Sequence, residues 1–164
     1  MIAWRITKRR YSSRDAVLGG GGAEEFGGRW NQAGLPLVYA SENASLALLE
    51  TLVQASMQRL PKSLVIVQIM VPDSLEVRTI GGEDLPASWK AIGSARCVAI
   101  GSEWIRSRAT PVLRVPSAVN PLEMNVLLNP AHRALAKCRV GKPIPLEFDA
   151  RLLSFLHGNI RQTL

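Results

Sequence analysis

The chain has 164 residues, the size of a single domain, and we expect one domain over residues 1–164. Hydrophobic residues make up 47% of it and charged residues 20%, a balance that excludes a disordered or fibrous protein. Lysine and arginine number 20 against 13 aspartate and glutamate, so the net charge is +7 and an anionic partner is expected. Nucleic acid, a phosphorylated small molecule and an acidic protein all fit this charge.

The cysteines and the apolar segments predict neither a metal site nor a membrane segment. Cys97 and Cys138 lie far apart, and only His132 and His157 could add nitrogen ligands, so we expect no metal and two reduced thiols. The basic N-terminus lacks the apolar core of a signal peptide. The apolar stretch 64–72 is far shorter than the ~20 residues that cross a bilayer. We therefore expect a cytoplasmic protein without membrane contact.

The first half of the chain predicts two strands, a glycine-rich loop and a helix. Residues 2–6 form a plausible first strand. Six of the 13 glycines follow within residues 19–28, which favours a loop whose backbone needs the freedom of glycine. Residues 37–40 predict a short buried strand that ends at Ser41, which is a good N-cap for a helix over residues 43–58.

The second half is richer in predicted strands and contains two more helical patterns. Helices are expected over residues 97–108 and 149–157, from apolar spacing and from the glycine at position 158. Branched or alternating runs predict strands at 64–71, 75–80, 112–115 and 125–128. Because strands and helices mix without a regular βαβ rhythm, we expect an α+β fold with a mixed, largely antiparallel sheet flanked by helices.

Glu50 is the only charged residue of the predicted helix 43–58. A helical projection places it within or beside an apolar stripe made of Leu46, Leu49, Val53 and Met57. A carboxylate in such a place is costly unless it is paired, hydrogen-bonded or facing a polar cavity. It is therefore the acid of a functional site, half of a structural ion pair with an internal arginine, or a residue on a helix edge that faces water.

Arg29 and Tyr39 are the next candidates. Arg29 follows two glycines, so backbone and guanidinium could approach an anion together, although a loop arginine lying over Trp30 explains the pattern equally well. Tyr39 ends a predicted strand, where ligands often meet a fold, although a buried core tyrosine is the commoner case.

Ser117 and Asn125 are polar residues among apolar strand residues, for which capping and turn hydrogen bonds are the usual explanation. The chain has no P-loop, G-x-G-x-x-G, G-x-S-x-G or H-E-x-x-H motif, which excludes the enzymes that depend on them. His132 follows Pro130 and Ala131 in an expected turn, and we interpret it as structural.

Five motifs in order carry a resemblance that covers nearly the whole chain. They are Gly27-Gly28-Arg29-Trp30-Asn31, Val38-Tyr39-Ala40-Ser41, Ala47-Leu48-Leu49-Glu50, Val112-Leu113-Arg114-Val115-Pro116-Ser117-Ala118 and Asn125-Val126-Leu127-Leu128-Asn129-Pro130-Ala131-His132. Together they resemble the RES-domain family. The chain departs from the family pattern at Ser102, Val126 and Arg133, none of which is a candidate site residue.

The resemblance implies a toxin of a bacterial type II toxin–antitoxin module, with an Xre-like helix-turn-helix antitoxin as partner and a fold similar to ADP-ribosyltransferases. It also implies that NAD⁺ is consumed as a substrate, not recycled as a cofactor, with water, phosphate or a protein as the acceptor of ADP-ribose. Carried over by position, the catalytic residues are Arg29, Tyr39 and Glu50. NAD⁺ is then bound by Arg29, Tyr39 and Ser117, with Arg5 and Asn125 as further candidates for the pocket wall.

The roles follow from the reaction that the resemblance implies. Cleavage of the nicotinamide–ribose bond builds positive charge on the ribose, and a fixed carboxylate stabilises such a transition state. Glu50 is expected to supply that carboxylate, Arg29 to hold the diphosphate or the nearby ribose, and Tyr39 to stack on or beside the nicotinamide.

Two other interpretations stay open. One is a basic nucleic-acid-binding module or nuclease toxin that stacks bases on its tryptophans, which are Trp4, Trp30, Trp89 and Trp104. No RNA-binding signature is present, so direct nucleic-acid binding is not expected. The other is a protein whose only task is to bind an acidic antitoxin.

Overall fold

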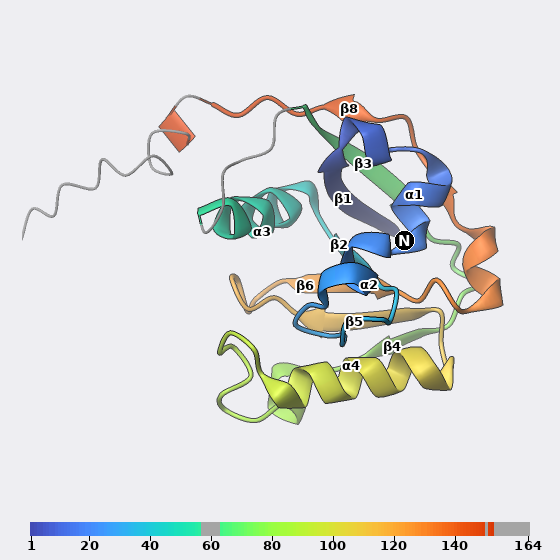
Figure 1. The fold of residues 1–164 in the computed structure, drawn as a ribbon, viewed down its shortest axis with the longest axis vertical. Coiled ribbons are helices and arrows are strands. Elements are labelled where there is room, and N and C mark those ends of the chain that lie inside the picture. The colour runs from blue at the N-terminus through green and yellow to red at the C-terminus, as the bar shows by residue number, and fades with distance from the viewer. Residues whose placement is uncertain (57–62, 150, 153–164) are drawn as a thin grey trace, which may run out of the picture.

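The protein is built around one mixed, mostly antiparallel sheet, which confirms the expected fold class. The computed structural model describes residues 1–56, 63–149 and 151–152. The sheet has eight strands in the order β4-β5-β6-β2-β1-β3-β7, with β8 also paired to β3 (Figure 1). All pairs are antiparallel except β4 with β5. The strands are β1 (Ile2–Lys8), β2 (Val38–Ser41), β3 (Leu64–Met70), β4 (Val77–Thr79), β5 (Val112–Pro116), β6 (Met124–Leu128), β7 (Arg139–Val140) and β8 (Ile144–Pro145).

Helices cover both faces of this sheet. They are α1 (Arg14–Gly19), α2 (Gly21–Phe26), α3 (Ala44–Ser56) and α4 (Ala95–Ser107), with short 3-10 helices η1 (Arg9–Tyr11), η2 (Gly82–Asp84) and η3 (Arg133–Lys137). Within the described residues, no helix is both long and apolar enough to cross a membrane.

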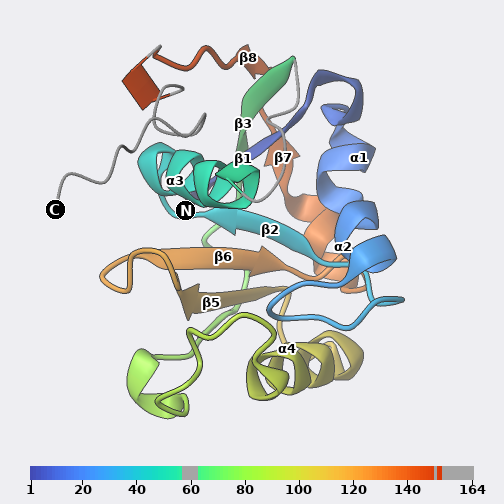
Figure 2. The same ribbon diagram turned by 60° about the vertical axis from the view of Figure 1, so that its left-hand side comes forward.

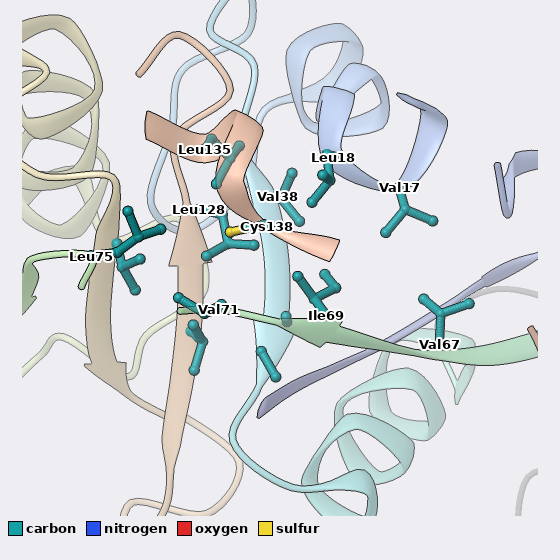
Figure 3. Packing of buried hydrophobic residues seen from close by; sticks show 14 of the residues in the cluster. Val17, Leu18, Val38, Val67, Ile69, Val71, Leu75, Leu128, Leu135 and Cys138 are labelled. Carbon is teal, nitrogen blue, oxygen red and sulfur yellow. The ribbon is translucent and has the colours of Figure 1, made fainter. Parts of the chain in front are cut away.

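Each face of the sheet has its own hydrophobic cluster, because side chains alternate between the faces along a strand. On one face, α1 and η3 pack on the middle strands through a cluster that includes Val17, Leu18, Val38, Val67, Ile69, Leu128 and Leu135 (Figure 3). On the other face, α4 packs on β5 and β6 through a cluster that includes Trp30, Leu37, Trp104, Ile105, Leu113 and Leu127. Tyr39 borders this second cluster, which places its ring on the face that α4 covers.

The sheet is split between β1 and β2. These strands share a single register pair, Trp4 with Ser41, whereas β1 pairs with β3 along its whole length. Helix α3 packs on both strands at the split (Figure 2). Arg5 spans it, because Nη1 donates to the backbone carbonyl of Tyr39 at 2.7 Å.

The glycine-rich loop predicted for residues 19–28 is wrong over its first part. Helices α1 and α2 occupy most of it, and only Gly20 separates them, with φ at +71°. A Cβ on Gly20 would lie 2.6 Å from the backbone nitrogen of Leu37. Gly27 has a positive φ as well, at +70°, so the freedom of glycine is required at particular positions and not along the whole run.

Helix α3 begins at a different cap from the one predicted. The Oδ1 of Asn43 accepts from the backbone N–H of Leu46 at 2.7 Å, so Asn43 is the N-cap. Ser41 is instead the last residue of β2, where the sheet uses its hydroxyl. The prediction of Ser41 as the cap was wrong because two residues able to cap lie close together and the sheet occupies the first.

The apolar stripe predicted on this helix is also wrong in part. Leu46 and Ala47 are buried, but Leu49 and Val53 are 38% and 41% exposed. Helix α3 is therefore rotated so that its first turns face the sheet and one edge of the stripe faces solvent. Met57 lies outside the described residues.

The remaining predicted elements are confirmed with small shifts of their ends. Helix α4 stands where residues 97–108 predicted one, and β3, β4, β5 and β6 match the four strands predicted in the second half. Most of the helix predicted for 149–157 lies outside the described residues. Cys97 and Cys138 are both buried free thiols.

Candidate active site

Glu50 is held by two side chains from the sheet. It projects from α3 and is half-buried. Its Oε1 accepts from Ser117 Oγ at 2.8 Å and from Asn125 Nδ2 at 2.6 Å. Ser117 directly follows β5, and Asn125 lies in β6. Three residues singled out from the sequence thus meet at one carboxylate oxygen.

The second oxygen of Glu50 is open. Oε2 has no hydrogen-bond partner among the described residues, and it is not one of their buried unpartnered atoms, so solvent reaches it. None of the ion pairs in the described part of the chain includes Glu50. The structural ion pair that the sequence left open is therefore absent there, and the carboxylate is fixed by neutral donors alone.

The two donors to Glu50 are themselves held in place. Ser117 is fully buried, and its Oγ accepts from the backbone N–H groups of Val119 at 3.1 Å and Asn120 at 3.0 Å. These bonds occupy its lone pairs, so its proton is directed at Glu50. The Oδ1 of Asn125 accepts from Ser41 Oγ at 2.8 Å, which turns its amide nitrogen toward Glu50. Turn capping and a role at the acid are therefore combined in Ser117.

Tyr39 centres a second polar cluster. Its hydroxyl accepts from the backbone N–H of Trp30 at 2.9 Å and donates to Asn31 Oδ1 at 2.8 Å. Burial raises the pKa of Tyr39 above its ordinary value, so the phenol stays neutral and remains a donor. A Cβ on Gly28 would lie 2.6 Å from this hydroxyl, so glycine is needed there for the close approach.

Asn31 is a site residue that sequence reasoning did not select. It is buried, and its Nδ2 lies within hydrogen-bond distance of three backbone carbonyls, those of Ala23, Gln32 and Leu35, at 2.7–3.1 Å. It ties the glycine-rich segment to the strand that carries Tyr39. The available signal was its place beside Trp30 in the first of the five motifs.

Arg29 contacts the segment before α4 and not Glu50. Its Nη1 donates to the carbonyls of Trp89 at 2.7 Å and Ala91 at 2.9 Å, and Nη2 donates to that of Lys90 at 3.2 Å. The guanidinium therefore holds residues 89–91 beside the turn over residues 28–31, which contains Trp30.

Arg5 is a cation with unused capacity at the split in the sheet. It is half-buried, and burial lowers its pKa to about 10, so it remains charged at neutral pH. Its Nε is buried without a hydrogen-bond partner. The guanidinium thus has donors left after its bond to Tyr39.

The two clusters adjoin on one face of the sheet. Tyr39 and Ser41 are two residues apart on β2, so their side chains share a face about 7 Å apart. Their partners on β6 are Leu127 and Asn125. Within the described residues, no three His, Cys, Asp or Glu side chains come together as a metal site would require.

Comparison with known proteins identifies the family. The model of the RES domain family matches residues 2–149. The Prs ADP-ribosylating toxin of Sphingobium sp. strain YBL2 is 40% identical over 157 residues, covering 92% of this chain and 95% of that protein. Toxin Res of Yersinia enterocolitica is 36% identical over 154 residues, covering 93% and 99%. A chain in the crystal structure of the M. tuberculosis MbcT–MbcA toxin–antitoxin complex has the same fold, with a TM-score of 0.73 at 20% identity and coverage of 96% and 89%. The chain belongs to the RES domain family.

Proposed function

We propose that this protein is a toxin that consumes NAD⁺ by cleaving the nicotinamide–ribose bond and passing ADP-ribose to an acceptor. The names of its relatives support the class, since one is an ADP-ribosylating toxin and another is Toxin Res. The observation that carries the chemistry is the state of Glu50, whose Oε1 is fixed by two neutral donors while Oε2 stays open.

This arrangement suits a transition state in which the ribose becomes positively charged. A carboxylate paired with an arginine would have its charge largely compensated, whereas Ser117 and Asn125 orient Glu50 without cancelling its charge. Oε2 is free to accept a hydrogen bond from a ribose hydroxyl and to face the developing cation. Nicotinamide leaves as a neutral group and needs no acid of its own.

The two arginines have different parts in the proposed site. Arg5 is charged and lies at the split in the sheet, where its positive charge favours a diphosphate. Arg29 holds residues 89–91 and would bind a phosphate only by giving up those carbonyls. Tyr39 presents a neutral ring on the same face as Glu50, where it can pack beside the nicotinamide.

The partner we propose is an antitoxin. The structural neighbour was solved in a toxin–antitoxin complex, and the net charge of +7 favours an acidic partner. An Xre-like helix-turn-helix protein remains the expectation from the resemblance. Copurification of the chain with the product of a neighbouring reading frame tests this.

Glu50→Gln tests the reaction directly. The substitution keeps the shape and removes the charge, so we expect NAD⁺ consumption to fall by about 10²–10³-fold. Glu103→Gln, the same change on the exposed side of α4, is the matched control and should leave turnover unchanged. Release of nicotinamide is measured on proteins with verified folding, and turnover of Glu50→Gln equal to the parent would reject the mechanism. Mass analysis of the products with phosphate or cell lysate identifies the acceptor.

The nucleic-acid interpretation loses most of its structural support. Trp30, Trp89 and Trp104 are 2%, 5% and 2% exposed, so they belong to the core and offer no face to a base. Trp4, the fourth tryptophan, is half-buried. Binding to RNA that falls steeply with salt, together with unchanged NAD⁺, would reverse this conclusion.

A further inference from the structure

A second carboxylate network joins the start of α3 to the turn between β5 and β6. Asn43 caps α3 with its Oδ1, and its Nδ2 donates to Glu123 Oε1 at 2.8 Å. The other oxygen, Glu123 Oε2, accepts from Asn120 Nδ2 at 3.0 Å. One carboxylate therefore links the helix cap to the turn.

This network closes on Glu50. The backbone N–H of Asn120 donates to Ser117 Oγ at 3.0 Å, and that hydroxyl donates to Glu50 Oε1 at 2.8 Å. Asn43 and Glu50 are seven residues apart, which is about two helical turns, so they lie on the same side of α3. The hydrogen bonds thus form one closed ring that includes the acid. It runs from Glu50 through Ser117, Asn120 and Glu123 to Asn43, and returns to Glu50 along α3.

The chemistry of Glu123 fits a linking role. It is half-buried, and none of the ion pairs in the described ranges of the chain includes it. Its charge lies at the N-terminus of a 13-residue helix, where the helix dipole favours an anion. Both of its oxygens accept from amides, which a glutamine could not do in the same orientation, because it offers one acceptor and one donor group.

We propose that Asn43 and Glu123 are positioning residues for Glu50, a proposal that rests on the function proposed above. They fix the rotation and the height of α3 relative to Ser117, and so direct Oε2 of Glu50 at the substrate. A small displacement of a reacting group is costly, since misplacement by about 1 Å can lower a rate about 100-fold. The ring acts on catalysis through Glu50 and does not touch NAD⁺.

A donor–acceptor exchange tests the ring. Asn43→Asp keeps the helix cap but brings a carboxylate against Glu123, and Glu123→Gln places a donor against one of the two asparagines. The double variant remakes the bond between positions 43 and 123 with reversed polarity, keeps the bond from Asn120 Nδ2 with its original polarity, and has the parent net charge. We expect each single change to lower kcat for NAD⁺ about 10- to 100-fold with a smaller change in KM, and the double variant to recover to within about 3-fold of the parent.

Glu42→Gln is the matched control. Glu42 precedes Asn43 and binds Arg114 and the backbone N–H of Met124, at 2.8 and 2.9 Å, but it lies outside the ring. Its loss should lower the unfolding midpoint and leave kcat unchanged. Where Asn43→Asp fails to fold, Asn120→Asp combined with Glu123→Gln makes the same exchange on the other arm.

Two results would overturn the proposal that the ring positions Glu50. In the first, the single variants lose stability yet keep the parent kcat. In the second, the double variant fails to recover the kcat that the single variants lose. Amide hydrogen exchange of Asn120 reports the ring without any substrate, and exchange unaltered in both single variants overturns the proposal as well. If Glu50→Gln keeps full turnover, the proposed function fails instead, and the exchange measurement alone decides the ring.

Discussion

The two polar clusters on this face of the sheet use their hydrogen-bonding capacity differently. Around Glu50, donors converge on one oxygen and leave the other open. Around Tyr39, the phenol hydroxyl and the side-chain amide of Asn31 both form hydrogen bonds within the protein. The guanidinium of Arg29 donates to backbone carbonyls. The first cluster has capacity left for a ligand and the second is saturated. We therefore expect changes near Glu50 to affect turnover first, and changes near Tyr39 to affect stability first.

Asn125→Asp is the strongest challenge to the first half of this comparison. It would set a carboxylate 2.6 Å from Glu50 Oε1, so the two acids would have to share a proton and the charge facing the ribose would fall. We expect NAD⁺ turnover about 100-fold below the parent, with an acid limb of the pH–rate profile moved to higher pH. Asn125→Ala removes the donor without the repulsion and should lose less. Equal turnover of Asn125→Asp and the parent would contradict the assignment of Glu50.

Tyr39→Phe is the corresponding test of the saturated cluster. It keeps the ring but leaves Trp30 N–H and the buried Asn31 Oδ1 without their partner, which should lower the free energy of unfolding by about 1–3 kcal/mol. Turnover per folded molecule should change little. A fall in turnover larger than the fall in stability would move Tyr39 into the chemistry.

The same variant has a pH signature. The pKa of Tyr39 is raised by burial, so the unfolded chain ionises first once the pH exceeds about 10. The folded state then holds the extra proton, and its stability falls as the pH rises further. Denaturant titrations above pH 10 should show this fall in the parent and a shallower one in Tyr39→Phe.

The acid and its partners could be found from sequence because each conflicts with its surroundings. Glu50 is a lone charge on an apolar helix, and Ser117 and Asn125 are polar among apolar strand residues. Such conflicts are costly unless they are resolved in three dimensions, so they mark places where the fold supplies a partner. The sequence could not predict that Glu50, Ser117 and Asn125 hydrogen-bond to one another, because this depends on how α3 packs against β5 and β6.

The errors arise where local patterns permit two outcomes. Ser41 and Asn43 both suit a helix cap, and only the pairing of β2 with β6 assigns Ser41 to the sheet. A helical projection defines the stripe that holds Leu49 but not which edge of it meets the sheet. Asn31 looks like any polar turn residue until the carbonyls it binds are brought around it.

Substitution of Arg29 has the smallest expected effect on stability. It also tests whether the cluster around Tyr39 has any capacity left to bind a ligand. Arg29→Lys keeps the charge but cannot reach three carbonyls with a planar fork, so the segment around Lys90 should loosen at a cost of about 0.5–1.5 kcal/mol. Faster tryptic cleavage after Lys90 would report this, with Arg78→Lys on the exposed edge strand as the control.

The KM for NAD⁺ separates the two possible roles of Arg29. If Arg29 only holds the segment, the Arg29→Lys and Arg29→Ala variants should raise the KM for NAD⁺ alike. If its charge also binds the diphosphate, the Ala variant alone should raise it, and the cluster around Tyr39 is then not saturated.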